Sequence, residues 1–355
     1  MKLIVNARFL TQQITGVQRF AIELSKRLKK QTSIEVQFVS PKGIIHHDLA
    51  KELDAKVIGH FSGHLWEQLD LPRFLKYNNS PLLLSLCSTA PCFYKNQIVT
   101  HHDITYIRCP ESFSKKFIVF YKLIVPLMLK NSKKIITVSN FSKDEVSNYF
   151  KISKDKFIVI YNGVDSEQFN VLRKDDKTAQ KYILAVSSRN FHKNFQGLIK
   201  AFKDVKNELK DVNLHIVGGS EIKSFNNIEL DIEDLKEEKR IHFLGRVDDQ
   251  ELIRSYQNAS LFVFPSFYEG FGIPPLEAQA CGCPVIASNK ASMPEVLADS
   301  ALYFDPTSTK ELSDQIKFFY NHVEQKDKLS ERGLQNIERF DWDHSFRKLL
   351  EEIIS

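Results

Sequence analysis

The alternation of short apolar runs with longer amphipathic stretches constrains the fold of this chain more than any other feature. The apolar runs are rich in β-branched residues, and we expect strands at residues 2–5, 35–39, 82–86, 98–100, 134–138 and 157–160, and again at 182–186, 214–217, 241–244, 261–264 and 285–287. Residues 16–30 have the apolar spacing of a crossover helix. Fully apolar strands separated by helices predict parallel sheets covered on both faces, which is an α/β fold.

The pattern occurs twice, and 355 residues are enough for two domains. The turn signal at 162–163 and the polar run at 173–178 favour a boundary between residues 164 and 181. We predict an N-terminal domain at 1–170, a C-terminal domain at 171–340, and a final helix at 341–355 that packs back on the first domain. Two doubly wound domains would face each other across a cleft, with ligands at the carboxyl ends of the strands.

The net charge of +5 conceals a difference between the two halves of the chain. Residues 1–170 contain 24 Lys and Arg against 14 Asp and Glu, whereas the remaining residues contain 25 against 30. A basic half joined to an acidic half suggests that the first half meets an anionic partner, such as nucleic acid, lipid phosphate or an anionic membrane.

The sequence predicts a cytoplasmic protein. Asn6 and Arg8 interrupt the first apolar stretch at once, so no signal peptide is expected, and no run reaches the roughly 18 apolar residues of a membrane span. The five cysteines are odd in number and lack CxxC spacing, which favours reduced thiols.

The segment EGFGIPPLE at 269–277 is the strongest candidate for a binding site. Gly270 and Gly272 leave the backbone open to close approach, and proline is favoured in a first helical turn. The segment therefore predicts a strand, a bare loop and a helix N-terminus whose amides favour a diphosphate. Glu269 on the loop and Glu277 in the first helical turn would reach one hydroxylated ligand. Alternatively, Glu277 only complements the helix dipole, and Glu269 is a solvated charge.

Two histidines follow the predicted strand at 98–100. In a doubly wound fold, a histidine at this end of a strand points into the cleft, which makes His101 and His102 candidates for chemistry. The alternative is that one histidine packs in the core and Asp103 caps a turn.

A second polar segment, SSRNFHKN at 187–194, follows the predicted strand at 182–186. Arg189 and Lys193 in this segment are suited to clamping phosphates. The alternative is that both are exposed loop cations.

Taken together, these motifs resemble the retaining glycosyltransferases of family 4, also called group 1, which have the two-Rossmann GT-B architecture. The matching parts cover nearly the whole chain: TGVQR at 15–19, WEQ at 66–68, HD at 102–103, TVSNFS at 137–142, NGVD at 162–165, KN at 193–194, HFLG at 242–245, PS at 265–266, EGFGIPPLE at 269–277, CPVIA at 283–287 and PEV at 294–296. Each part alone is a weak signal, whereas the ordered set is specific. The WEQ motif resembles the branch that builds bacterial surface polysaccharides of the O-antigen or lipopolysaccharide type, in which mannosyl transfer is common.

The resemblance implies roles for individual residues. The implied catalytic residues are His102, Glu269 and Lys193, and the implied donor-binding residues are Gly16, Ser187, Arg189, Lys193, Arg246, Val247, Glu269, Gly270, Phe271, Gly272 and Glu277. Lys193 would neutralise the leaving diphosphate, Glu277 would hold the nucleotide ribose, and His102 would lie against the reacting sugar. Arg246 and Val247 would line the base.

Two departures from the family pattern concern the phosphate site. Many relatives have an arginine just before the lysine or a few positions upstream, whereas here His192 precedes Lys193 and Arg189 is the only arginine nearby. The N-terminal loop holds one glycine, Gly16, where many relatives have two or more.

The resemblance also implies a reaction. Family members retain the anomeric configuration, through same-face attack by the acceptor while the leaving diphosphate takes the proton. No cofactor and no metal are expected, because the one Asp-x-Asp, at 341–343, lies where a final helix begins and fits helix capping. The implied substrates are a nucleotide sugar, with GDP-mannose expected first and a UDP-sugar second, and a growing, lipid-linked glycan.

Residues 113–134 mix six lysines with large apolar side chains. This segment is either a core helix with solvated lysines or a contact with an anionic membrane that Phe117, Phe120 or Tyr121 enters. Lipid-linked acceptors favour peripheral contact with the cytoplasmic face of the inner membrane. The alternatives for function are a nucleotide-sugar epimerase of the same fold and a non-catalytic nucleotide-sugar-binding protein, whereas the acidic second half argues against nucleic acid.

Overall fold

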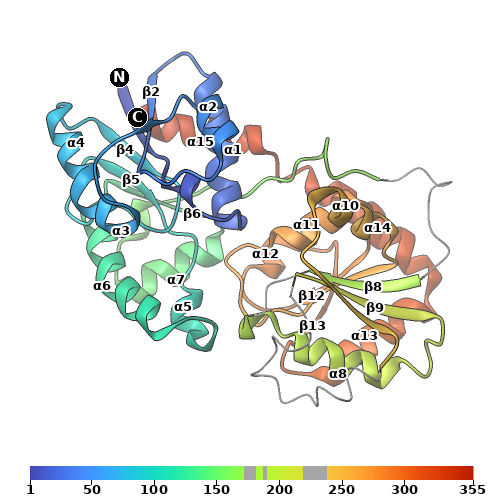
Figure 1. Ribbon diagram of the computed structural model, residues 1–355. Helices are drawn as coiled ribbons and strands as arrows, with labels where there is room; N and C mark the ends of the chain where they lie inside the picture. Colours follow the sequence, from blue (N-terminus) through green and yellow to red (C-terminus); the bar gives the residue numbers. More distant parts are fainter. Residues whose placement is uncertain (172–180, 187–189, 219–237, 355) are drawn as a thin grey trace. The chain divides into compact units, whose positions relative to one another are not determined.

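The computed structural model describes residues 1–171, 181–186, 190–218 and 238–354. They form two compact units, each built around one parallel sheet surrounded by helices (Figure 1). Unit 1 comprises Met1–Ile104, Ser114–Asn162 and Trp342–Ser355, and unit 2 comprises Thr105–Phe113 and Gly163–Asp341. The predicted α/β fold with two doubly wound sheets is confirmed. The chain crosses between the units at Asn162–Gly163, and the sequence did not indicate that Thr105–Phe113 belongs to unit 2.

The sheet of unit 1 has the strand order β3-β2-β1-β4-β5-β6-β7. Its strands are β1 (Lys2–Asn6), β2 (Glu35–Ser40), β3 (Lys56–Val57), β4 (Leu82–Ser85), β5 (Gln97–Thr100), β6 (Lys134–Thr137) and β7 (Phe157–Val159). Its helical segments are η1 (Arg8–Thr11), α1 (Gly16–Lys30), α2 (His47–Glu52), α3 (Gly63–Leu65), the π-turn η2 (Trp66–Asp70), α4 (Leu71–Tyr77), α6 (Lys115–Asn131), α7 (Asn140–Phe150), η4 (Lys154–Lys156) and α15 (Trp342–Ile354).

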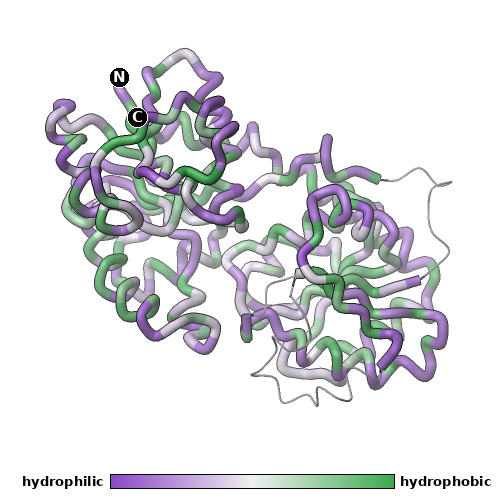
Figure 2. Tube along the Cα trace, in the orientation of Figure 1, coloured by the Kyte–Doolittle hydropathy of each residue, from purple (hydrophilic) through white to green (hydrophobic). Residues whose placement is uncertain are grey.

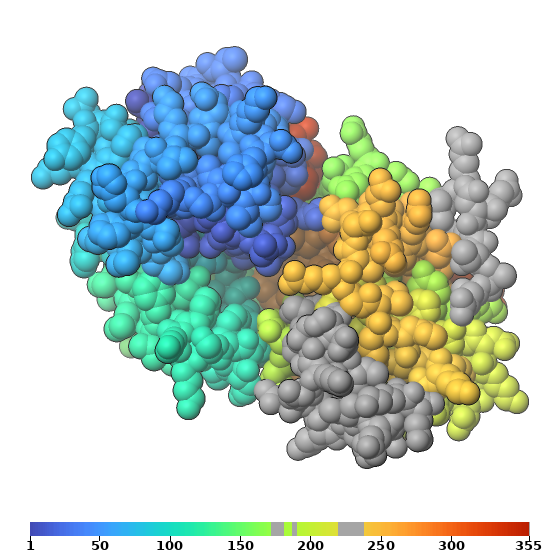
Figure 3. All heavy atoms as spheres, in the orientation of Figure 1, coloured from blue at the N-terminus to red at the C-terminus, as the bar shows by residue number. Residues whose placement is uncertain are grey.

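The last helix of the chain packs against the first. The Phe20 ring on α1 lies 6.1 Å from the Trp342 ring on α15, and the Arg27 guanidinium lies 2.6 Å from the Asp343 carboxylate. In Figure 3 the red atoms of the chain's end accordingly lie against the blue atoms of its start. Both ends of the sequence are therefore needed to build unit 1.

The sheet of unit 2 has the strand order β10-β9-β8-β11-β12-β13. Its strands are β8 (Lys181–Val186), β9 (Val212–Val217), β10 (Ile241–Gly245), β11 (Leu261–Phe264), β12 (Val285–Ser288) and β13 (Leu302–Phe304). Its helical segments are α5 (Thr105–Arg108), η3 (Pro110–Ser112), η6 (Phe191–Lys193), α8 (Phe195–Val205), α10 (Asp249–Asn258), α11 (Ile273–Ala280), α12 (Met293–Leu297), α13 (Thr309–Asn321) and α14 (Val323–Ile337).

Alternation along the strands of unit 2 explains why both faces of its sheet are covered. Ile183 and Ala185 on β8 point into the cluster formed with α8 and α13, and the intervening Leu184 is equally buried on the other face. Figure 2 shows the central strands as largely hydrophobic. Strands that are apolar on both faces must be covered on both faces, as the fully apolar runs in the sequence predicted.

Every predicted strand is present, with ends that differ by at most two residues. The sequence missed β3 and β13, which lie at sheet edges and have only two and three residues. Runs this short show no periodicity. Within the described ranges, no helix is both long enough and apolar enough to cross a bilayer.

Candidate functional site

The carboxyl edge of the unit 2 sheet carries the segments that the sequence indicated. β8 and β11 are neighbours in the middle of the sheet, and the strand order reverses between them. In open parallel sheets, ligands bind outside the strand ends at such a reversal. Lys193 follows β8 and Glu269 follows β11, so both residues belong to this position.

Lys193 and Glu269 form an ion pair at the reversal. The Lys193 Nζ lies 2.6 Å from the Glu269 Oε1 and 5.8 Å from the centre of the Phe264 ring. The two side chains keep 17% and 13% of their surface exposed. Because an ammonium group has three N–H donors, Lys193 can bind an anion without giving up Glu269.

Asn194 fixes the backbone that carries Lys193. It adopts a left-handed conformation with φ of 53°, and its side-chain amide donates to the carbonyls of Pro265 and Pro306 at 3.1 and 2.8 Å. Its side-chain oxygen accepts from the Gly197 amide and so caps α8. Pro265 and Pro306 follow β11 and β13, so one side chain ties the lysine loop to the ends of two strands.

His192 is buried beneath the same loop. Its Nδ1 lies 2.8 Å from the Ser112 Oγ, and its ring stacks parallel to that of Phe113. Its carbonyl accepts a 2.7 Å hydrogen bond from the Phe267 amide, which links the lysine loop to the loop after β11. The residue that replaces the usual arginine therefore anchors the loop and is 5% exposed.

Ser292 holds the loop from Glu269 to Gly272 through two hydrogen bonds. The Ser292 hydroxyl is 3.0 Å from the carbonyls of both Glu269 and Phe271. Gly272 has φ of +92°, and a Cβ at this position would lie 2.3 Å from the Met293 Cε. A left-handed backbone in this crowded place explains why the loop needs a glycine.

The helix after this loop presents fewer amides than the sequence suggested. α11 begins at Ile273, so Pro274 and Pro275 occupy its second and third positions. Proline has no N–H, which removes two of the donors that a helix N-terminus normally offers. Amide donors for an anion would come from the loop residues Gly270, Phe271 and Gly272 and from Ile273.

Glu277 lies one turn further along α11 than predicted. It is the fifth helical residue and not part of the first turn, so complementing the helix dipole does not explain it. It is 7% exposed, and its Oε2 accepts a 3.0 Å hydrogen bond from the Tyr256 hydroxyl on α10. Burial and the nearby Glu277 carboxylate raise the pKa of Tyr256 well above its usual value, so Tyr256 remains a donor.

The remaining donor-binding residues of unit 2 divide into two groups. Arg246 and Val247 follow the edge strand β10, at the same carboxyl edge as Lys193 but two strands away from β8. Ser187 and Arg189 lie outside the described residues.

Of the unit 1 candidates, His102 is packed into the unit. It is 6% exposed, its ring centre lies 5.1 Å from that of Phe20, and its Nε2 is 3.2 Å from the Leu86 carbonyl. Burial lowers the pKa of His102, so the ring is neutral at neutral pH. A carbonyl can only accept, so we assign the proton to Nε2, and Nδ1 is left as an acceptor.

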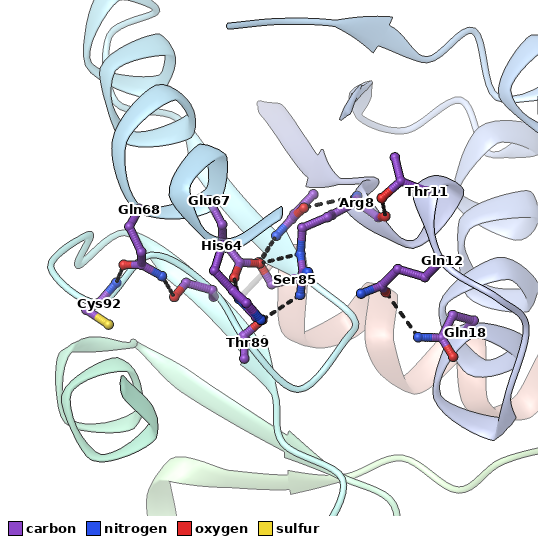
Figure 4. A network of polar contacts seen from close by, with 12 residues as sticks. Arg8, Thr11, Gln12, Gln18, His64, Glu67, Gln68, Ser85, Thr89 and Cys92 are labelled. Carbon is purple, nitrogen blue, oxygen red and sulfur yellow. Dashed lines mark hydrogen bonds and ion pairs between the residues drawn. The ribbon is translucent and has the colours of Figure 1, made fainter. Parts of the chain in front are cut away.

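Gly16 begins α1. Thr15 caps this helix, and the Thr15 amide donates to the Gln18 side chain in a capping box. Gln18 also donates to Gln12 at 3.0 Å, as Figure 4 shows. This arrangement fixes the start of the helix around Gly16, and none of these contacts involves a charged side chain.

A polar network that the sequence did not indicate occupies the strand reversal of unit 1 (Figure 4). Asn6 and Ser85 end β1 and β4, the two strands between which the order reverses, and the Asn6 amide donates to the Glu67 Oε1 at 3.0 Å. Arg8 donates to the same Glu67 oxygen through Nε at 3.2 Å and to the Thr89 hydroxyl through Nη2 at 2.8 Å. A buried ion pair therefore sits where the topology would place a ligand.

Glu67 is ionised although it is completely buried. Burial by itself would raise its pKa, but the Arg8 charge and a hydrogen bond from His64 outweigh this and lower the pKa to about 2. His64 approaches the second carboxylate oxygen at 3.3 Å. The WEQ motif contained Glu67, but nothing in the sequence linked it to Arg8, which is 59 residues away.

Across the described ranges, no cluster of three or more His, Cys, Asp or Glu side chains is arranged to hold a metal ion. The Asp-x-Asp at 341–343 lies at the start of α15, where Asp343 pairs with Arg27.

The two halves of the chain match two family models. Residues 14–168 match the model described as Glycosyltransferase Family 4, and residues 165–336 match the model described as Glycosyl transferases group 1.

Two relatives match along nearly the whole chain. The O-antigen chain mannosyltransferase B of Escherichia coli is 28% identical, with 97% of each chain covered. The O-antigen chain mannosyltransferase RfbU of Salmonella typhimurium is 29% identical, with 96% of each chain covered.

Solved structures share the fold. A glycosyltransferase from Rickettsia africae superposes with a TM-score of 0.75 at 22% identity, covering 100% of this chain and 98% of that one. HepE of Anabaena, crystallised with UDP and glucose, superposes with a TM-score of 0.80 at 18% identity, covering 99% of both chains.

Proposed function

Because this chain belongs to the group 1, family 4 glycosyltransferases, we propose that it transfers mannose from GDP-mannose to a growing, lipid-linked glycan with retention of configuration. The sugar is proposed from the two relatives that match almost end to end, both of which are named as O-antigen chain mannosyltransferases. The product would be a surface polysaccharide. A UDP-sugar is the second candidate donor, since UDP is the nucleotide bound to HepE in the Anabaena structure.

The observation that carries the proposal is the Lys193–Glu269 pair at the strand reversal of unit 2. A cation and the amides of Gly270, Phe271 and Gly272 border the same loop, and this combination suits a diphosphate. Glu269 adds a carboxylate that can accept hydrogen bonds from sugar hydroxyls.

In the proposed reaction, the bond between the anomeric carbon and the donor phosphate oxygen breaks. The acceptor oxygen bonds to the same face of that carbon, and its proton passes to the departing phosphate oxygen. The ring becomes cationic and the diphosphate gains negative charge, so fixed donors beside the diphosphate lower the barrier. Among the described residues, Lys193 is the one proposed to supply a positive charge there. No metal is proposed.

Glu277 is proposed to hold the ribose of the donor nucleotide. Tyr256 donates to one of its oxygens and so orients the carboxylate. An ionised carboxylate accepts several hydrogen bonds, which suits the adjacent hydroxyls of a ribose. His102 is proposed to accept a hydrogen bond from the reacting sugar through Nδ1. Full activity of His102→Ala would identify His102 as a packing residue instead.

A donor panel tests the proposal directly. Thermal unfolding with GDP-mannose, UDP-glucose and ADP-glucose should show the largest stabilisation with GDP-mannose, because only a ligand that binds the folded state raises the midpoint. Glu277→Ala should abolish that stabilisation, measured against the midpoint of the free variant, which should itself fall because the buried Tyr256 hydroxyl loses its acceptor. Stabilisation by GDP-mannose that persists in Glu277→Ala would place the donor elsewhere.

Product analysis separates the alternatives. With donor and a mannose-terminated acceptor, the enzyme should form an α-linked product in the presence of EDTA. The one-bond coupling between the anomeric carbon and its hydrogen in the NMR spectrum identifies the anomer and so reports retention. A new sugar epimer formed from donor alone would identify an epimerase. Donor binding without any product from a panel of glycan acceptors would favour a binding protein.

A further inference from the structure

Six large apolar side chains of unit 1 are exposed on three segments of the chain. Leu65, Leu69, Phe93, Val119, Leu123 and Leu127 are between 40% and 78% exposed. Single exposed apolar residues are ordinary on protein surfaces, whereas a contiguous group marks a surface that binds something. We therefore asked whether the three segments are neighbours.

Contacts join the three segments to one another. On the first segment, the His64 ring lies 4.4 Å from the Phe120 ring of α6, and the Gln68 side chain donates to the Ala90 carbonyl at 2.9 Å. The loop after Ala90 meets α6 in turn, because the Asn131 amide donates to the Cys92 carbonyl at 2.9 Å. Figure 1 shows the same neighbourhood, with α3 between α4 and α6. The exposed leucines and Phe93 adjoin these contact points in sequence.

On α6 the exposed apolar residues form one stripe. Val119, Leu123 and Leu127 are four residues apart, so they share a helix face. The opposite face is buried through Val125 and Met128. The rings that the sequence suggested for a membrane contact are not the exposed ones: the Phe117 ring stacks on Tyr121 at 4.0 Å, and Phe120 lies against His64. Because the rings pack against neighbours, the aliphatic stripe is the apolar part of α6 that is exposed to solvent.

Basic residues accompany these apolar side chains, and two of the three segments, the Phe93 loop and α6, lie in stretches of sequence without carboxylates. Residues 71–102 and 112–143, which contain α4, the Phe93 loop and α6, hold ten of the chain's 49 Lys and Arg and none of its 44 Asp and Glu. The rest of the chain is therefore net negative. Exposed basic residues in this region are Arg73, Lys76, Lys95, Lys115, Lys116, Lys122, Lys130 and Lys133.

The α6 lysines are available to a partner. Among the residues that the structure describes, none of Lys115, Lys116, Lys122 and Lys130 forms an ion pair with a carboxylate. The two carboxylates closest in sequence to Leu65 and Leu69 are Glu67 and Asp70, and both are buried. Cations without local counter-charges suit an extended anionic surface.

We propose that this docking face, formed by the six apolar residues and the surrounding lysines and arginines, binds the surface of an anionic lipid bilayer. Aliphatic and phenyl side chains would enter the boundary between headgroups and acyl chains, and the ammonium groups would lie among the lipid phosphates. Charge complementarity favours lipid over a second copy of the chain, because two such faces would repel each other. The inference concerns binding to lipid and does not depend on the sugar that is transferred.

Flotation with vesicles tests the docking face. The full chain should float with phosphatidylcholine vesicles that contain phosphatidylglycerol, should float poorly with phosphatidylcholine alone, and should detach as salt is raised. The double variant Phe93→Glu/Leu123→Glu should stay at the bottom of the gradient. The matched control is Val323→Glu on α14 of unit 2, a position that is 77% exposed, and it should float like the unchanged chain.

A charge variant separates binding through the docking face from nonspecific adsorption to vesicles. Each basic residue near an anionic surface contributes roughly fivefold to partitioning, so Lys116→Ser/Lys122→Ser should weaken binding to the anionic vesicles roughly thirtyfold. Lys326→Ser/Lys328→Ser, two exposed lysines on α14, should have little effect. Equal losses of vesicle binding in the two double variants would overturn the proposal.

Two other outcomes would also contradict the proposed docking face. Equal flotation with and without phosphatidylglycerol would remove the role of the lysines. Sedimentation that reveals a dimer of the unchanged chain, and a monomer of Phe93→Glu/Leu123→Glu, would make the face an interface between copies. Donor binding measured by thermal shift should be unchanged in all these variants, so failure of the docking face is distinguishable from failure of the donor site.

Discussion

The strand reversals of the two sheets hold the same kind of ion pair in different surroundings. In unit 2 the Lys193 and Glu269 side chains are 17% and 13% exposed, whereas in unit 1 those of Arg8 and Glu67 are 9% and 0% exposed. Both oxygens of the Glu67 carboxylate accept hydrogen bonds from neighbouring side chains, and Arg8 is also bonded to Thr89.

The difference teaches that topology alone does not identify a ligand site. The Glu67 side chain has no exposed surface that a substrate could reach, so the unit 1 pair holds strand ends together. The unit 2 pair reaches solvent beside a loop that supplies backbone amides. Access to solvent therefore favours the unit 2 reversal as the proposed donor site.

The largest expected effect is on the stability of unit 1. Arg8→Ala should lower the free energy of unfolding by about 3–5 kcal/mol, because it leaves the Glu67 charge buried without its partner. Arg27→Ala is the control, since Arg27 pairs with Glu23 and Asp343 near the surface and should cost at most about 1 kcal/mol. Denaturant titration measures both. Equal losses in the two variants would remove the distinction between the buried pair and a surface pair.

The next effect is on the transfer rate through unit 2. Lys193→Ala should slow transfer by ~10²–10³, which is the usual cost of losing one electrostatic donor at a developing charge. The free energy of unfolding of this variant should change by less than about 1 kcal/mol, because the Lys193–Glu269 pair is partly exposed. Lys206→Ala, which breaks the Lys206–Glu238 pair, should leave the rate unchanged. Unchanged transfer in Lys193→Ala would refute its assignment to the leaving group.

The unit 1 pair should also make the stability of the fold depend on acid. The folded pKa of Glu67 is about 2 and its ordinary value is 4.5, so the ionised group stabilises the fold above pH 4.5 and this contribution is lost as the pH falls toward 2. The stability difference between the unchanged chain and Glu67→Gln should therefore be constant near neutral pH and should shrink in that acid window. A difference that is independent of pH down to the acid transition would mean that Glu67 is not stabilised as an ion.

The smallest effect concerns the loop glycine. Gly272→Ala should destabilise the chain by roughly 1–3 kcal/mol, because alanine is strained at a positive φ and its Cβ would displace Met293. Gly43→Ala has a similar φ of +89° but open space around it, so it isolates the backbone cost. The amount by which Gly272→Ala lowers the free energy of unfolding more than Gly43→Ala does is the cost of the clash with Met293. If the two variants are equal, Met293 moves aside freely.

Much of the fold was predictable because fully buried parallel strands are visible as apolar runs. The sequence also predicted that Lys193 and Glu269 each follow a strand, and the structure showed that these strands, β8 and β11, are neighbours. The start of α11 was harder to predict. Two prolines moved the first turn upstream and left Glu277 in the second.

The rest could not be predicted, because it depends on contacts between distant residues. Arg8 on η1 and Glu67 on η2 are 59 residues apart and meet only in the folded unit, and no local pattern records this. The segment Thr105–Phe113 joins unit 2 through Ser112 and His192, which are 80 residues apart. The exposed stripe on α6 depended on which of its apolar residues other helices covered.

The packing of α15 on α1 has a consequence for how the molecule is made. Domains generally fold in the order in which the ribosome delivers them, but the first sheet here waits for a helix that begins at Trp342. During synthesis the Phe20 ring lacks its neighbour Trp342 until residue 342 has been translated. A stop codon placed just before Trp342 would therefore harm the half of the protein that was translated first.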